Sequence, residues 1–512
     1  MPEDAEALGG WDRLTAMRMQ WDAWSRRRRV LSVLAGALLL SAGLFASYCI
    51  AVNVLIRTRL LRALINDGPD KVWIEYSSAY SLWPGRLRVS NLQIRDRARV
   101  SEWIITLDEG RASVSLLDLL RGRFHPTRIR GSGLALRVRG RLTPEEATPR
   151  RLSFLPPISG FPAPPLLEPG ETPPLPTGRE WTIQLEDVVV DAVREIWVDG
   201  YHYTGDATLA GGMLLHPRVR FEVLPTSLEV RSGTLRLNEE PLATSVRARL
   251  DTVIHPYELR GATASIILSS MTGTGRAEGR IESIHFLHEM LRIRPTLRLD
   301  GGTGTLAAEL SLHGGHGKGA VDFSAKGVEA VMTDAAMTGE ADGQIRLARL
   351  DLESGLADFT GSHLDVRDVL VKRGDEEPWP WWGRLELGAG DLRTGPPRVL
   401  YAHLELRAQN ARPLYRLLNA QLPPWAEWLL KMEGVTATAD VALAKSFMDV
   451  KSLEAQGGAF HILGRYHRGE GSHDGAFLID AGPLAVGVGL GGGESEVALV
   501  DARRWFRERM AR

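Results

Sequence analysis

The chain has 512 residues, with 62 Lys plus Arg against 63 Asp plus Glu, and a formal net charge of -1. Nucleic-acid-binding proteins carry a basic excess, so this balance gives no reason to expect a nucleic acid as partner. The single cysteine, Cys49, excludes an internal disulfide framework and any thiolate metal site with two or more Cys ligands.

An apolar stretch from Val30 to Ile56 follows four arginines, Arg26 to Arg29. Its 27 residues carry no charge. At about 1.5 Å of rise per residue, a helix of that length crosses a bilayer with some tilt. The arginines predict that residues 1–29 lie in the cytoplasm and that the bulk of the chain lies on the far side of the membrane. A cleaved signal peptide is the alternative, but its apolar core would be shorter.

Residues 1–29 place Trp11, Trp21 and Trp24 near helical spacing, with charged residues between them. This pattern predicts an amphipathic segment at the cytoplasmic interface, where tryptophans favour the headgroup level. An arm that docks a cytoplasmic partner is the alternative. After the transmembrane helix at 30–56, we expect helical structure to continue to about Ile65.

The period of the apolar pattern changes from 3.6 to 2 in the N-terminal β region, residues 66–142. Leu87 and Val89 alternate with arginines, and Leu92 and Ile94 follow after a one-residue slip at 90–91. The slip predicts a bulged strand.

Two parts of the chain resemble AsmA-like proteins. The first is a Trp-Pro-Gly turn at Trp83, Pro84 and Gly85 that leads into a strand, followed by SLLDLLRGRF and by a strand beginning near Ile129. The second is LLNAQLPPWAEWLL followed by GGAFHILGRYHRGEGSHDGAFLIDAGPLAVGVGL, which is similar to the end of related proteins in the same superfamily, to which the larger TamB type is also related. AsmA-like proteins are anchored in the inner membrane of Gram-negative bacteria. The resemblance implies a periplasmic β-groove associated with phospholipid movement and outer-membrane biogenesis.

A proline-rich segment at 143–179 interrupts the strands and holds 11 of the chain's 28 prolines. Such a composition favours extended polyproline conformations over sheet pairing. We interpret it as a surface loop or linker, and a docking peptide for another envelope protein is the alternative.

Strand patterns resume and fill residues 180–500, each run with one apolar and one polar face. Helical patterns are confined to about 282–291, to 412–432 with a kink at two prolines, and to a C-terminal helix at 501–512. If about 20 strands lie side by side at roughly 4.8 Å, the sheet is on the order of 95 Å long. Three short helices cannot cover the apolar face of such a sheet.

The predicted fold is therefore all-β: an elongated, curved antiparallel sheet forming an apolar groove, with one N-terminal transmembrane helix and a few short helices. Two sheets packed as a sandwich would be the alternative. A groove could hold phospholipid or another acyl lipid, because each buried methylene contributes about 0.8 kcal/mol. The candidate lining residues are Leu134, Leu136, Val138, Val219, Phe221, Val223, Val246, Leu250, Leu297, Leu299, Leu404 and Leu406.

Enzymatic patterns are weak, and we expect neither catalysis nor a cofactor. His313 and His316 in HGGHGKG could supply two metal ligands, but no third ligand stands at a recognisable spacing. The glycines of GVGLGGG, from Gly487, lack the following helix that a phosphate site needs. The runner-up function is that of a structural or scaffolding envelope protein without bound lipid.

Overall fold

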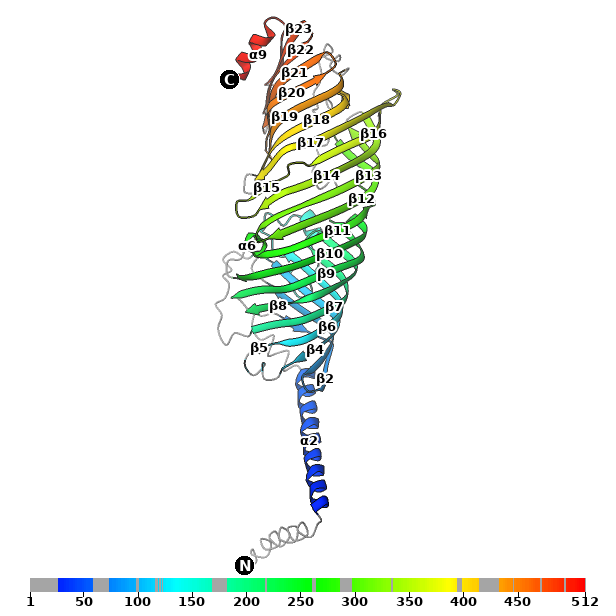
Figure 1. The fold of residues 1–512 in the computed structure, drawn as a ribbon, viewed down its shortest axis with the longest axis vertical. Helices are drawn as coiled ribbons and strands as arrows, with labels where there is room; N and C mark the ends of the chain where they lie inside the picture. Colours follow the sequence, from blue (N-terminus) through cyan, green and yellow to red (C-terminus); the bar gives the residue numbers. More distant parts are fainter. Residues whose placement is uncertain are drawn as a thin grey trace, which may run out of the picture.

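A computed structural model of the chain shows one long, curved β-sheet with a single helix extending from its N-terminal end (Figure 1). The strands stack along the long axis of the molecule, and the C-terminal helix lies at the opposite end (Figure 1). The residues described are 26–58, 73–97, 101–115, 118, 121, 123–167, 182–216, 219–259, 264–285, 297–332, 335–393, 398–413, 432–444, 446–469, 472–491 and 494–511.

The described helices are α2 (Arg26–Arg57), α5 (Pro149–Ser153), α6 (Ala264–Ser269) and α9 (Ala502–Met510). The strands of the N-terminal half are β1 (Trp73–Glu75), β2 (Ser78–Trp83), β3 (Arg86–Arg97), β4 (Ser101–Val114), β5 (Arg123–Phe124), β6 (Pro126–Gly140), β7 (Thr182–Val198), β8 (Tyr201–His216), β9 (Arg220–Leu237), β10 (Glu240–Glu258), β11 (Met271–Ile281) and β12 (Leu297–His313). Those of the C-terminal half are β13 (His316–Met332), β14 (Ala335–Asp351), β15 (Leu356–Asp358), β16 (His363–Arg373), β17 (Trp379–Arg393), β18 (Val399–Asn410), β19 (Glu433–Ala444), β20 (Met448–Gly457), β21 (Phe460–Gly469), β22 (Ser472–Ala481), β23 (Leu484–Gly491) and β24 (Glu494–Ala498).

The all-β class and the elongated single sheet predicted from the sequence are confirmed. From β7 to β14 and again from β17 to β24, each strand pairs antiparallel with the next along the chain. The exception to the antiparallel prediction is β7, which pairs in parallel with β5 and β6. Parallel neighbours need a long crossover connection, and the segment between β6 and β7, residues 141–181, supplies it. This segment includes the proline-rich stretch.

The described part of the crossover lies against one face of the sheet. Arg139 of β6 donates hydrogen bonds to the carbonyls of Pro156 and Pro162, at 3.3 and 3.0 Å. Trp73 of β1 meets Phe161 edge-on at a ring distance of 5.7 Å. Between the crossover and the sheet is a cavity of about 440 Å³, with Arg137 and Glu195 among its lining residues. The described residues of the proline-rich segment, up to 167, thus pack on the sheet.

The bulge predicted in β3 is absent, and the slip at 90–91 is instead a local change of backbone conformation that β6 shares. Asn91 and Gly133 both have positive φ, 51° and 72°, and they lie on β3 and β6 on either side of Asp108 in β4. Pairing keeps one register across this point, so β3 contains no inserted residue opposite β4. A side chain at position 133 would lie 2.2 Å from the Asp108 carboxylate, which explains the glycine. The apolar side chains therefore stay on one face of the sheet.

Helix α9 packs against β22 and β23, where Phe506 and Ala502 form a buried cluster with Ala476 and Leu478. Three predictions fall wholly or largely outside the described residues: the cytoplasmic segment at 1–29, the end of the first helix near Ile65, and the kinked helix at 412–432. The helix predicted at 282–291 is described only to residue 285.

Candidate functional site

One face of the sheet, here called the apolar face, is apolar from the first strands to the last. Residues directly opposite each other on paired strands point to the same face. Strand register therefore traces this face as two continuous runs of apolar residues. The first run is Leu92, Leu107, Leu134, Val193, Ala207, Val230, Ala248, Ala277, Ala308, Val321 and Ile345. The second run is Phe323, Gly343, Leu364, Leu385, Leu406, Ala437, Ala455, Ile462, Ile479 and Val486.

The opposite face is charged. Glu229, Arg249, Arg276 and Glu309 follow one another across β9 to β12 in the row beside the apolar one. Further along, Arg384 forms an ion pair with Asp365, its cross-strand partner, at 3.3 Å. Alternate residues of the same strands are thus separated into a water-facing side and an apolar side.

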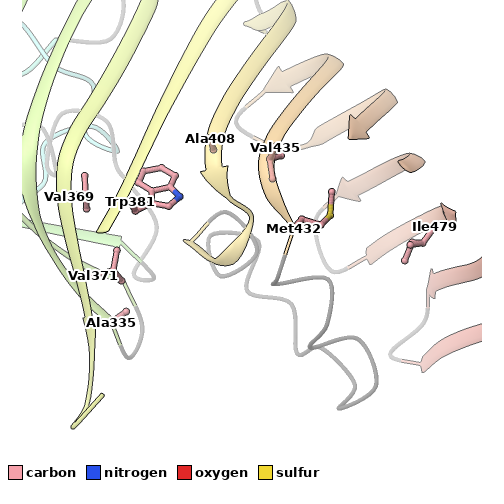
Figure 2. Close-up of a cluster of buried hydrophobic side chains, with 8 residues drawn as sticks. All are labelled: Ala335, Val369, Val371, Trp381, Ala408, Met432, Val435 and Ile479. Carbon is pink, nitrogen blue, oxygen red and sulfur yellow. The ribbon is translucent and has the colours of Figure 1, made fainter. Parts of the chain in front are cut away.

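The apolar face lies on the inner side of the curved sheet. Figure 2 shows eight buried side chains on the concave side of an arch of strands, seven from strands between β14 and β22 and one, Met432, from just before β19. They are Ala335, Val369, Val371, Trp381, Ala408, Met432, Val435 and Ile479. A second buried cluster lines the same face between β4 and β10, and it includes Leu107, Val193, Tyr203, Val230 and Val246.

The middle of the apolar face is open. Leu310 of β12 and Ile345 of β14 each remain 49% exposed. Aromatic rings lie over glycines there: a Cβ at Gly343 would meet the Phe323 ring at 2.6 Å, and one at Gly383 would meet the Trp381 ring at 2.6 Å. The rings thus lie against the backbone at these glycines and add to the apolar surface of the face.

Two tyrosines on this face, Tyr203 and Tyr257, are shielded from water by the side chains around them. Burial raises the pKa of Tyr257, whose ring meets Phe221 at 5.9 Å. Burial also raises the pKa of Tyr203, and the nearby Asp206 carboxylate adds to the effect. A surface poorly accessible to water disfavours the charged phenolate, so both shifts are what an apolar surrounding produces.

The described helices lie elsewhere. Helix α9 packs against Ala476 and Leu478, which alternate with the apolar-face residue Ile479, so α9 covers the opposite face. Helix α5 belongs to the crossover, α6 lies in the connection between β10 and β11, and α2 contacts β2 at the first edge of the sheet. Within the described ranges, therefore, no helix packs across the middle of the apolar face.

The predicted lining residues are placed as follows. Leu134 and Leu406 belong to the two runs, and register places Leu136, Val138, Phe221, Val223, Leu250 and Leu404 opposite other apolar residues. Val246 is buried, Leu299 packs beside a buried cluster, and Leu297 pairs with Met332 through its backbone. Val219 is different: it lies in the turn before β9 and is exposed, because β9 begins only at Arg220.

Several residues of this face were missed in the sequence. Trp381, Phe323 and Tyr203 stand in strands where glycines and prolines hide the alternation. For Trp381, the available signal was the spacing of two residues from Trp379 to Trp381 and on to Gly383, which places all three on one face of a strand.

The histidines singled out in the sequence, His313 and His316, face each other across the hairpin of β12 and β13. His316 lies 4.0 Å from Asp351. Across the residues that the structure describes, His, Cys, Asp and Glu side chains form no group of three that could hold a metal ion.

Comparisons of this chain with protein-family models, with curated proteins and with solved structures found no match. The class that the fold defines is a long, curved β-sheet with an apolar inner face, joined to one helix, Val30–Arg57, that is long and apolar enough to cross a membrane.

Proposed function

We propose that this protein is a membrane-anchored, periplasmic lipid-binding protein that carries phospholipid along its apolar face without catalysis. Helix α2 would anchor it in the inner membrane with the N-terminus in the cytoplasm, as the four arginines before the apolar stretch favour. The resemblance to AsmA-like proteins supports a role in phospholipid transport or outer-membrane biogenesis in a Gram-negative envelope.

The observation that carries the proposal is the two runs of apolar partners, which overlap on β13 and β14 and together cross the sheet from β3 to β23. About twenty successive strand positions at roughly 4.8 Å give a path on the order of 95 Å long. Soluble proteins seldom expose contiguous apolar patches beyond a few hundred Å². Acyl chains are suitable occupants, because they need no specific polar partner and gain about 0.8 kcal/mol for each buried methylene.

A photo-crosslinking experiment tests this function in the membrane, where detergent cannot replace the ligand. Benzoylphenylalanine is placed at Ile345, which is exposed on the apolar face, or at its neighbour Arg346, which is exposed on the charged face. Cells are labelled with ³²P-phosphate and irradiated, and the purified full chain is analysed for labelled lipid adducts.

We expect adducts at position 345 and few at position 346, because the two side chains project from opposite faces of β14. Equal labelling at both positions would point to random lipid contact. Absence of label at both would favour the structural or scaffolding role and would overturn lipid carriage.

A further inference from the structure

The end of helix α2 is joined to the first hairpin of the sheet by specific polar contacts. The Asn53 carboxamide donates to the Ser81 carbonyl at 2.7 Å and accepts from the Ser81 backbone amide at 2.9 Å. It thus pairs with the free edge of β2 as a neighbouring strand would. The Tyr76 hydroxyl donates to the Ile56 carbonyl at 2.6 Å. The end of α2 is therefore held to the sheet at two places, Asn53 and Ile56.

The hairpin of β2 and β3 runs back along the helix, toward its N-terminus. The Gly85 amide donates to the Tyr48 hydroxyl at 3.2 Å, and the Trp83 ring lies 5.4 Å from that of Phe45. Phe45 precedes the end of the apolar span at Arg57 by about 18 Å at the helical rise. The tip of the hairpin, defined here as residues 82–85, is therefore level with apolar helix residues and not with the helix end.

The side chains of this tip suit a lipid surrounding. Leu82 is 72% exposed and Trp83 is 60% exposed. Trp is favoured at the membrane interface, where its ring meets hydrocarbon and its N–H meets polar groups. The apolar face begins beside this tip, with Val89 directly opposite Gly110 and then Gly131 and Val190 in register.

Two arginines stand where headgroups would lie. Arg88 and Arg111 are directly opposite each other on β3 and β4, and both are exposed. Like charges in this position repel, and neither arginine forms an ion pair with a residue that the structure describes. Arg88 pairs across strands with Tyr80, next to Ser81, so its depth matches that of Asn53 near the helix end. Phosphate groups would neutralise the pair.

We infer that the tip at 82–85 inserts into the periplasmic leaflet of the inner membrane beside α2, with Arg88 and Arg111 binding lipid phosphates. The inserted tip holds the first strands of the apolar face in direct contact with membrane lipid, so acyl chains reach the sheet without crossing water. The inference rests on the membrane anchoring proposed above and not on lipid carriage.

Depth-dependent quenching tests the inserted tip in the full chain. Cys49 is replaced by Ala, and a single cysteine is introduced as Leu82→Cys, Arg88→Cys or, as control, Leu484→Cys. Leu484 is 69% exposed at a hairpin turn at the other end of the sheet, so it matches Leu82 in exposure. Each variant carries a nitrobenzoxadiazole label and is reconstituted into vesicles of phosphatidylethanolamine and phosphatidylglycerol.

We expect the label at 82 to lose most fluorescence with acyl-chain doxyl lipids, and the label at 88 to lose most with headgroup nitroxide lipids. The label at 484 should respond to aqueous iodide alone. Iodide quenching at 82 equal to that at 484 would overturn the insertion, whether or not Ile345 forms lipid adducts. Insertion without adducts would overturn lipid carriage alone.

Discussion

Arg139 of β6 and Glu102 of β4 form an ion pair that is almost fully shielded from solvent, with side chains 5% and 0% exposed. The Arg139 Nε donates to the Glu102 carboxylate at 2.8 Å, and its two terminal nitrogens donate to the carbonyls of Pro156 and Pro162. Arg97 Nε approaches the other carboxylate oxygen at 3.2 Å. The pair therefore joins two strands of the sheet to the crossover that connects β6 with β7.

Replacing Glu102 by Ala should lower the free energy of unfolding by about 3–5 kcal/mol, because the buried Arg139 charge would lose its partner. Urea unfolding of the full chain in detergent measures this change. Glu376→Ala is the control: its ion pair with Arg373 is solvent-exposed, so its effect should stay within about 1 kcal/mol. A loss at Glu102 no larger than that of the control would contradict the structural role of the buried pair.

Lipid binding should respond to charge on one face of a strand only. Leu406→Asp places a carboxylate on the apolar face, and Arg407→Asp places one on the opposite face. Losing contact with about three methylenes at about 0.8 kcal/mol each lowers lipid affinity about fifty-fold. Organic extraction and mass spectrometry of the purified proteins measure retained phospholipid. Equal retention by the two variants, with the sheet intact by circular dichroism, would argue against the apolar face as the binding surface.

Two glycines of the apolar face should differ in their tolerance of a methyl group. At Gly343 the new Cβ would meet the Phe323 ring at 2.6 Å, whereas at Gly275 the nearest atom is Leu250 Cδ1 at 3.5 Å. Gly343→Ala should therefore cost about 1–3 kcal/mol in stability, since an overpacked ring must move. Gly275→Ala, with an ordinary contact, should be close to neutral. Thermal unfolding compares them. Phe323→Leu should relieve the part of the Gly343→Ala defect that is due to the ring, whereas the contact with the His363 backbone carbonyl, at 2.8 Å, should remain. Similar unfolding of both variants would show that the ring does not rest on Gly343.

Period and composition were enough to predict the all-β class, the single N-terminal helix and many residues of the apolar face. Leu134 and Leu406 were found because strict alternation assigns a face before any partner strand is known. Val219 lies one residue before β9, a position that alternation cannot distinguish from the strand itself, and a turn from His216 precedes it.

The parallel pairing of β6 with β7 could not be predicted, because it depends on where the chain returns after the crossover. The proline-rich composition indicated an interruption, but it gave no sign that the described part, up to 167, packs on the sheet, as the hydrogen bonds of Arg139 to two of its carbonyls show. The pairing of Asn53 with Ser81 was likewise hidden, since an amide near the end of an apolar helix has no recognisable pattern.

Acid should destabilise the charged face at Asp440 of β19. Hydrogen bonds from the Ser452 hydroxyl, at 2.6 Å, and from His403, at 2.8 Å, hold the pKa of this carboxyl below its usual range. Because the folded pKa lies below the unfolded value of about 3.9, the stabilisation is complete above that value and is lost as pH falls through the folded pKa. Asp440→Asn should therefore unfold at a lower temperature at neutral pH and lose less on acidification than the parent chain.

Unfolding temperatures between neutral pH and about pH 3 measure the two curves, which should converge at the acid end as the parent carboxyl protonates. Ser452→Ala removes the hydroxyl that contributes most to the lowered pKa, so it should shift the acid limb of the parent curve toward higher pH. The effect is modest, because Asp440 is more than half exposed and water screens its partners. Parallel curves for Asp440→Asn and the parent chain across this range would show that the hydrogen bonds do not favour the ionised carboxylate in the folded protein.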